Sequence, residues 1–172
     1  MSILILNLSQ RRLGTSALLG RLMQEQLGEQ TQLWSCLDIE AAWDSFLEAA
    51  GLADTWIFIT PCYVNAIPGD AVEVLAKLHQ AELSRNKYVY AIAQGGMPYT
   101  HTHHCCIGNI ELFAKAMQQR WMGGLIIGGG AIIDGVTLKR LPNAVPVEHC
   151  LQKLIACIQH KTKVDSLLSK QA

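Results

Sequence analysis

The first residues with the means to do chemistry form the run Ser-Gln-Arg-Arg-Leu-Gly-Thr-Ser at positions 9–16. The run follows an apolar segment at positions 3–6 and precedes leucines at helical spacing, so it joins a strand to a helix. The first N–H groups of a helix lack partners within it and carry the positive end of its dipole, so they suit a phosphate. Five polar side chains can add to these donors: Ser9, Arg11, Arg12, Thr15 and Ser16. Gly14 permits a positive φ where the loop turns into the helix. The run therefore predicts a phosphate site. The alternative is an ordinary helix start with solvated arginines.

A second run, at positions 60–69, reads Thr-Pro-Cys-Tyr-Val-Asn-Ala-Ile-Pro-Gly and also follows an apolar segment of strand length. Its proline holds the chain extended, and the next four backbone N–H groups, with one side-chain amide, can donate to the edge of a flat ligand. The candidate binding residues are Pro61, Cys62, Tyr63, Val64 and Asn65. The alternative is a plain turn between a strand and a helix.

Two glycine-containing runs follow later strands. In the first, Gln94, Gly95 and Gly96, the glycines let the backbone approach a flat ligand closely; the alternative is a flexible start to a loop. The second, Gly128 to Gly130, indicates close packing or a subunit contact rather than a second phosphate loop, because no helical pattern begins directly after it.

The segment from His101 to Cys106, His-Thr-His-His-Cys-Cys, is rich in metal ligands. In an extended chain His101 and His103 would point the same way, as a zinc or copper site requires. No second ligand pair at finger-like spacing accompanies them, so we expect no metal site and interpret Cys105 and Cys106 as small buried side chains at a helix start. One histidine could instead contact a substrate.

Apolar periodicity predicts five strands alternating with helices. The expected strands cover positions 3–7, 32–37, 55–60, 88–93 and 124–127. The expected helices cover positions 15–27, 41–50 with Gly51 closing the helix, 69–78 after Pro68, 107–117 and 147–158. Five nearly continuous apolar strands separated by helices indicate an α/β fold with a parallel sheet covered on both faces.

Composition narrows the class of protein. The 172 residues, half of them apolar, fit one domain spanning 1–172. Fourteen basic and fourteen acidic residues give zero net charge without a basic patch, which disfavours nucleic acid as a partner. The six cysteines show no repeated spacing and no secretory signal precedes them, so we expect a cytoplasmic location. No apolar run is long enough to span a membrane. With only 16% charged residues, part of the surface is expected to be covered in a homodimer or homotetramer.

The first loop distinguishes two parallel-sheet folds. It lacks Gly-x-Gly-x-x-Gly, so the close approach to a dinucleotide pyrophosphate is absent and a terminal monophosphate suits the loop better. Asp38 stands where a dinucleotide-binding fold places a ribose ligand, but without the glycines we interpret it as a helix N-cap. The pattern therefore favours a flavodoxin-like sheet, with strand order 2-1-3-4-5.

Taken together, these motifs resemble those of the NAD(P)H-dependent FMN reductase and flavodoxin-like reductase family. Ser9, Arg11, Gly14 and Ser16 match its Ser-Pro-Arg-x-x-Gly-x-Thr/Ser phosphate loop, with Gln10 in place of the proline. Positions 60–69 are similar to its Thr-Pro-x-Tyr-x-x-x-x-Pro-Gly segment, which lies along the flavin ring. The family also includes iron-sulfur flavoproteins, but their compact cysteine motif is absent here.

The resemblance implies non-covalent FMN and hydride or electron transfer from NAD(P)H to a small-molecule acceptor such as a flavin or quinone. The flavin would carry this chemistry, so no side chain is expected to act as a catalytic acid or base. An alternative is a flavodoxin-type electron carrier, although a neutral chain lacks the acidic face that such carriers use. A further alternative is a metal- or redox-sensing protein that uses the segment from His101 to Cys106. Cys62 would be redox-active only with a lowered pKa; otherwise it fills the loop.

Overall fold

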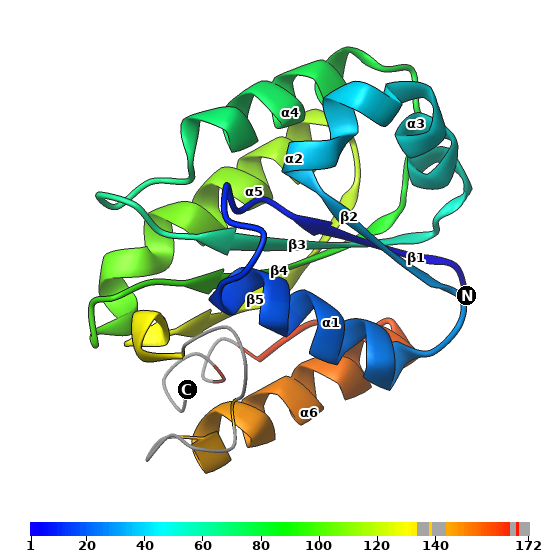
Figure 1. The fold of residues 1–172 in the computed structure, drawn as a ribbon. Helices are drawn as coiled ribbons and strands as arrows, with labels where there is room; N and C mark the ends of the chain where they lie inside the picture. The colour runs from blue at the N-terminus through cyan, green and yellow to red at the C-terminus, as the bar shows by residue number, and fades with distance from the viewer. Residues whose placement is uncertain (134–137, 139–143, 166–167, 169–172) are drawn as a thin grey trace.

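The protein is described by a computed structural model that covers residues 1–133, 138, 144–165 and 168. A twisted sheet lies at the centre, with helices above and below it (Figure 1). Among the described residues, no helix combines the length and apolar character that a membrane span requires.

The sheet has five parallel strands in the order β2-β1-β3-β4-β5, which confirms the predicted order. Their bounds are β1 Ile3–Asn7, β2 Thr31–Ser35, β3 Thr55–Pro61, β4 Tyr88–Gln94 and β5 Arg120–Ile127. Along the register, Asn7 lies opposite Ser35 and Ile59, and Gln94 lies opposite Pro61 and Ile127. The loops that leave β1, β3, β4 and β5 therefore meet at one edge of the sheet, where folds of this type bind ligands.

Six α-helices and three short 3₁₀ helices occur in the described part of the chain. The α-helices are α1 Thr15–Leu27, α2 Cys36–Ile39, α3 Trp43–Leu52, α4 Gly69–Gln80, α5 His104–Ala116 and α6 Ala144–His160. The 3₁₀ helices are η1 Glu40–Ala42, η2 Thr100–His103 and η3 Gly130–Ile132. As Figure 1 shows, α1 and α6 cover one face of the sheet, and α3, α4 and α5 cover the other.

The core divides into two layers because side chains alternate between the faces of a strand. On β1, Leu4 and Leu6 pack toward α3 and α4, whereas Ile3 and Ile5 pack toward α1 and α6. All four side chains are at most 1% exposed. The strands read as continuous apolar runs because both faces are covered.

Three local predictions around the second βα unit were wrong. The N-cap of α2 is Ser35, whose hydroxyl accepts a hydrogen bond from the Leu37 N–H at 3.3 Å, so β2 ends earlier than expected. Asp38 lies inside α2 and therefore does not cap it. Gly51 does not close the next helix, because α3 continues to Leu52 and Ala53 forms the C-cap.

Candidate functional site

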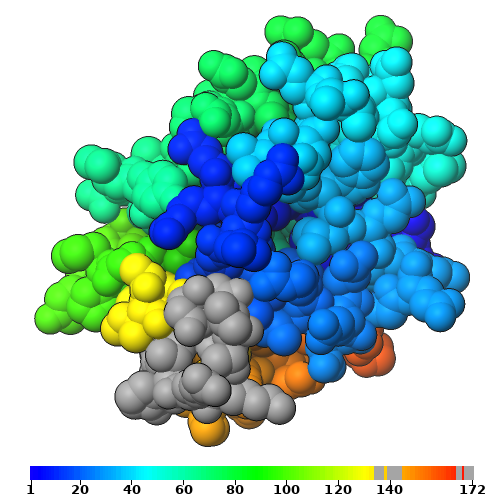
Figure 2. Space-filling model, in the orientation of Figure 1, coloured from blue at the N-terminus to red at the C-terminus, as the bar shows by residue number. Residues whose placement is uncertain are grey.

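A cavity of about 220 Å³ lies at the edge of the sheet where the strands end. Most of the predicted binding residues line it: Ser9, Arg11, Gly14, Thr15, Pro61, Cys62, Tyr63, Gln94, Gly95 and Gly96. Leu13, Ala131 and Ile133 complete the wall, and no motif in the sequence indicates them. In Figure 2 the first loop (dark blue), the segment after β3 (teal) and η3 (yellow) lie on the same face. The fold thus brings the three predicted loops together.

The first loop is shaped by its own side chains. The Asn7 Oδ1 accepts from the Ser9 N–H at 3.0 Å, and the Ser9 hydroxyl accepts from the Arg11 N–H at 3.2 Å. Gly14 is extended, with φ 178°, so the left-handed turn expected there is absent. No side chain caps α1 and its first turn carries no acidic residue. Its first N–H groups are thus available to an anion.

Two hydroxyls that were predicted to contact the phosphate have hydrogen-bond partners within the protein. The Thr15 hydroxyl donates to the carbonyl oxygens of Gly130 and Ile133, both at 2.8 Å, so its proton is used in joining α1 to η3. Ser16 is 1% exposed, is outside the cavity wall and accepts from the Gln94 side-chain amide at 3.1 Å. These residues position the start of α1, and the backbone N–H groups become the main donors of the loop.

The two arginines of the loop differ in their surroundings. Arg12 forms a two-pronged pair with Asp38, with nitrogen–oxygen distances of 2.8 and 3.2 Å. This contact raises the pKa of Arg12 through the hydrogen bond and the charge of Asp38. Arg11 is exposed and lines the cavity. Of the two arginines, only Arg11 lines the cavity, and Asp38, predicted as an N-cap, is an ion-pair partner of Arg12.

The segment after β3 forms a tight turn. Tyr63 and Ala66 exchange two backbone hydrogen bonds of 2.8 and 3.0 Å, and Val64 and Asn65 between them have φ of 49° and 58°. This pattern requires positive φ at both central residues, which is unfavourable for a β-branched valine. Val64 is 99% exposed, so no packing of its side chain offsets that strain.

The turn changes the predicted set of donors. The Cys62 N–H donates to the Gln94 carbonyl oxygen at 2.7 Å and the Tyr63 N–H donates to Ala66, so neither is free for a ligand. Val64 and Asn65, at the tip of the turn, lie outside the cavity wall. Only their N–H groups and the Asn65 amide remain as the predicted donors, and they would meet a ligand at the rim.

The glycines after β4 serve internal packing. A Cβ on Gly95 would lie 2.5 Å from the His103 ring, and a Cβ on Gly96 would lie 3.4 Å from Ala131. His103 is 2% exposed and its Nε2 is 3.1 Å from the Met97 carbonyl oxygen. His103 therefore supports this loop from beneath, a role that no pattern in the sequence indicates.

The remaining glycine run packs closely, as predicted. A Cβ on Gly128 would lie 2.2 Å from the Pro98 carbonyl oxygen, and one on Gly130 would lie 2.6 Å from the Gln94 side-chain oxygen. The run thus joins the end of β5 to the loop after β4.

The histidine segment is not extended. Residues Thr100–His103 form η2, in which His103 is buried while His101 is exposed and stacks on Tyr99 with ring centroids 5.7 Å apart. The common orientation that an extended chain would give the two histidines is therefore absent. Cys106 is buried as expected, but Cys105 is exposed.

Two thiols near the cavity, those of Cys62 and Cys106, favour their neutral form. Burial raises the pKa of Cys62, and burial together with the neighbouring Cys62 thiol raises the pKa of Cys106. A redox-active Cys62 requires a lowered pKa, so the structure favours its interpretation as an unreactive thiol.

A larger cavity, about 660 Å³, lies between α1 and α6. Leu18, Met23, Leu151 and Ile155 are among its lining residues, and all four belong to the core on that side of the sheet. It lies away from the loops at the strand ends, and none of the predicted binding residues lines it. We therefore assign the candidate site to the smaller cavity.

Comparison with known proteins identifies the fold. No protein-family model and no curated protein sequence matches the chain. Among solved structures, a flavodoxin mutant from Pseudomonas aeruginosa superposes with a TM-score of 0.66 at 13% identity, over 92% of this chain and 99% of that one. The chain has a flavodoxin-like fold.

Other solved structures with different descriptions share this fold. An NADPH-quinone reductase from P. pentosaceus has a TM-score of 0.60 at 14% identity, over 96% of this chain and all of that one. The Trp repressor binding protein from Bacillus subtilis has a TM-score of 0.56 at 18% identity, over 77% of this chain and 90% of that one. These neighbours agree with the resemblance found in the sequence, and at such identities they establish the fold.

Proposed function

We propose that the protein is an FMN-binding oxidoreductase that passes hydride or electrons from NAD(P)H through flavin to a small acceptor. The observation that carries the proposal is the uncapped N-terminus of α1 beside Arg11, in a cavity closed by the loops after β3 and β4. Neighbours described as a flavodoxin, a flavone reductase, an NADPH-quinone reductase and an azoreductase support it.

The donor set fits the phosphate of FMN. Backbone N–H groups at a helix start and one exposed guanidinium favour a dianion, and the first turn of α1 has no acidic residue to repel it. Thr15 and Ser16 would act indirectly, since their hydrogen bonds hold this turn in place.

The cavity accommodates only part of such a ligand. Its volume of about 220 Å³ is below the roughly 300–1,000 Å³ of typical cofactor sites. The ring would therefore lie at the rim, where Leu13 is 77% and Tyr63 is 42% exposed. A ring held at the rim leaves one face open to a nicotinamide or an acceptor.

Different groups of the site would bind the phosphate and the ring of the flavin. Arg11 and the start of α1 bind the phosphate, and the N–H groups of Val64 and Asn65 donate to the ring edge. Flavin, when bound, supplies the redox chemistry, and the protein positions it and excludes water from one side. We also propose that the protein forms a homodimer or homotetramer, because its surface carries few charged residues. Size-exclusion chromatography would test this.

The test is a titration of the purified full chain with FMN, followed anaerobically by NADPH and NADH. Quenching of flavin fluorescence with saturation, and bleaching by either nicotinamide, is the expected result. Failure to bind FMN would overturn the proposal. Bound flavin that neither nicotinamide bleaches would instead favour the electron carrier.

A further inference from the structure

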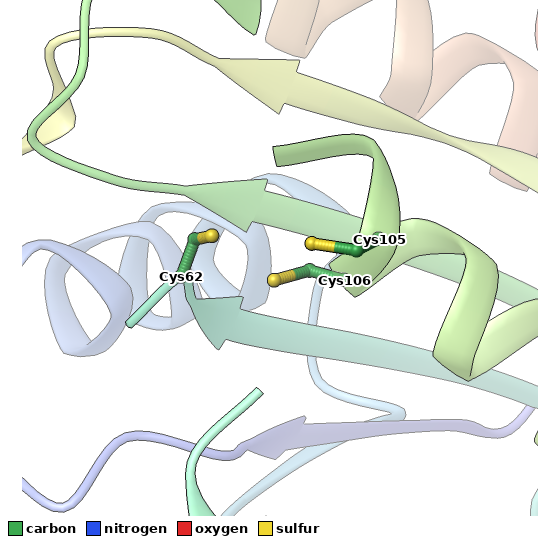
Figure 3. A group of neighbouring side chains, drawn as sticks. All are labelled: Cys62, Cys105 and Cys106. Atoms are coloured by element: carbon green, nitrogen blue, oxygen red, sulfur yellow. The ribbon is translucent and has the colours of Figure 1, made fainter. Parts of the chain in front are cut away.

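Three cysteines from two distant segments converge beside the candidate site. Cys62 follows β3, and Cys105 and Cys106 lie in the first turn of α5. Their three sulfur atoms all lie within 4.8 Å of one another. Figure 3 shows the side chains pointing toward one common space, Cys62 from one side and the other two from the opposite side. We propose that these cysteines bind one soft metal ion, such as Zn(II) or Cu(I), as a three-thiolate site.

The spacing of the sulfurs suits such an ion. Metal–sulfur bonds of about 2.3 Å, typical of zinc sites, place sulfur ligands roughly 3.8 Å apart. Side-chain rotations that move the sulfurs by on the order of 1 Å would close the site from its present spacing. Thiolates are the ligands that select Zn(II) and Cu(I) over harder cations.

The start of α5 favours the charge that binding creates. Metal binding converts the thiols to thiolates, and Cys105 and Cys106 stand at the positive end of this 13-residue helix. The first turn holds no acidic residue and no side chain caps it. At Cys106 this field opposes the burial that raises the pKa of the thiol, and the bound cation, which displaces the thiol protons, supplies the remaining stabilisation of the thiolates.

Oxygen ligands are at hand for a further coordination position. The Thr102 carbonyl oxygen lies 3.7 Å from the Cys62 sulfur and 4.0 Å from the Cys105 sulfur. The Asn65 carbonyl oxygen contacts the Cys105 sulfur. Either oxygen or a water could complete four-coordinate zinc, whereas Cu(I) would need the three sulfurs alone.

An ion can reach the site from solvent. Cys105 is exposed and Cys62 is partly exposed, while Cys106 forms the buried floor. Cys62 also lines the proposed flavin cavity, so the ion would lie next to that cavity. None of the proposed ligands belongs to the flavin, so the site does not depend on bound flavin.

The test uses the reduced full chain, with and without FMN, titrated with Cd(II) as a spectroscopic probe and with Zn(II) against a chromogenic chelator. We expect one ion per chain and a cadmium–thiolate absorption band. Cys62→Ser and Cys105→Ser should each weaken binding by at least about 100-fold, since even groups that only support a ligand contribute about 10- to 100-fold.

Cys157→Ser is the matched control, because Cys157 is also partly exposed but lies outside the cluster. It should bind Cd(II) like the unsubstituted protein. Absence of the thiolate band, or the same affinity in Cys105→Ser as in the parent, would overturn the proposal. The titration without FMN measures metal binding directly. Failure of FMN binding would therefore not affect the conclusion about the metal site.

Discussion

The Gln94 side-chain amide at the end of β4 donates a hydrogen bond of 3.1 Å to the hydroxyl oxygen of Ser16 in the first turn of α1. Both side chains are buried, and the Gln94 carbonyl oxygen also accepts from the Cys62 N–H at 2.7 Å. One residue therefore links all three loops of the candidate site, and the geometry of the first loop depends on it.

Removing this link should cost stability and flavin affinity together. Gln94→Ala is expected to lower the free energy of unfolding by about 1–3 kcal/mol, because it leaves the Ser16 hydroxyl without its buried partner. A double-mutant cycle with Ser16→Ala should show a coupling of about 0.5–1.5 kcal/mol in denaturant unfolding. Strictly additive losses would show that the hydrogen bond contributes nothing.

The two arginines of the first loop should behave differently in FMN titrations. Arg11→Ala is expected to weaken FMN binding by roughly 1.5–3 kcal/mol, the value of a hydrogen bond to a charged group. Arg12→Ala should have a much smaller effect, because its guanidinium is engaged by Asp38. If Arg12→Ala weakened binding as much as Arg11→Ala, the assignment of Arg11 to the phosphate would be wrong.

Relief of strain in the turn after β3 should stabilise the protein. Val64→Asn is expected to raise the free energy of unfolding by about 1 kcal/mol, because asparagine tolerates positive φ better than a β-branched residue. Val72→Asn, at a valine 52% exposed on α4, serves as the control; it should change the free energy by less than about 0.5 kcal/mol. Equal changes in the free energy of unfolding of the two variants would show that Val64 is not strained.

A methyl group at Gly95 should disturb the loop after β4. Gly95→Ala would place a Cβ 2.5 Å from the His103 ring, and such overpacking costs about 1–3 kcal/mol. Gly69→Ala is the control, since a Cβ there meets no atom within 4 Å. Thermal unfolding should separate the two variants, and FMN affinity should fall only in Gly95→Ala. Unchanged stability of Gly95→Ala would argue that His103 moves freely.

Stability in acid should depend on Asp54. Burial disfavours its charge, but hydrogen bonds from Thr55 and Lys161 outweigh burial and lower the pKa of Asp54 below the usual 3.8. A carboxylate with a lowered folded-state pKa stabilises the fold above the unfolded value and loses that contribution as the pH falls through the folded-state pKa. The difference in free energy of unfolding between the parent and Asp54→Asn should therefore shrink as the pH falls from the unfolded-state pKa of Asp54 through its folded-state pKa.

Denaturant unfolding across acid pH measures that difference. Glu48→Gln, which neutralises an exposed carboxylate on α3, serves as the control for the loss of one negative charge. A constant difference between the parent and Asp54→Asn down to the lowest pH would contradict the role of Asp54.

The sequence alone determined the sheet and the location of the candidate site. Continuous apolar strands such as Ile3–Asn7 identify a parallel sheet covered on both faces, and Pro68 before α4 marks a helix start by its lack of an N–H. The polar runs after β1, β3 and β4 then had to meet, because parallel strands end at one edge. These features depend on residues that are close together in the chain, so the periodicity of the sequence reveals them.

Only the tertiary structure decided which groups are free for a ligand. The Thr15 hydroxyl donates to Gly130, more than 100 positions away, and Arg12 forms an ion pair with Asp38. Cys62 joins Cys105 through folding alone, so no spacing in the sequence reveals the three-sulfur cluster. A hydrogen-bond donor or a thiol is defined by the partner within about 3–4 Å, and for these residues that partner comes from a distant segment.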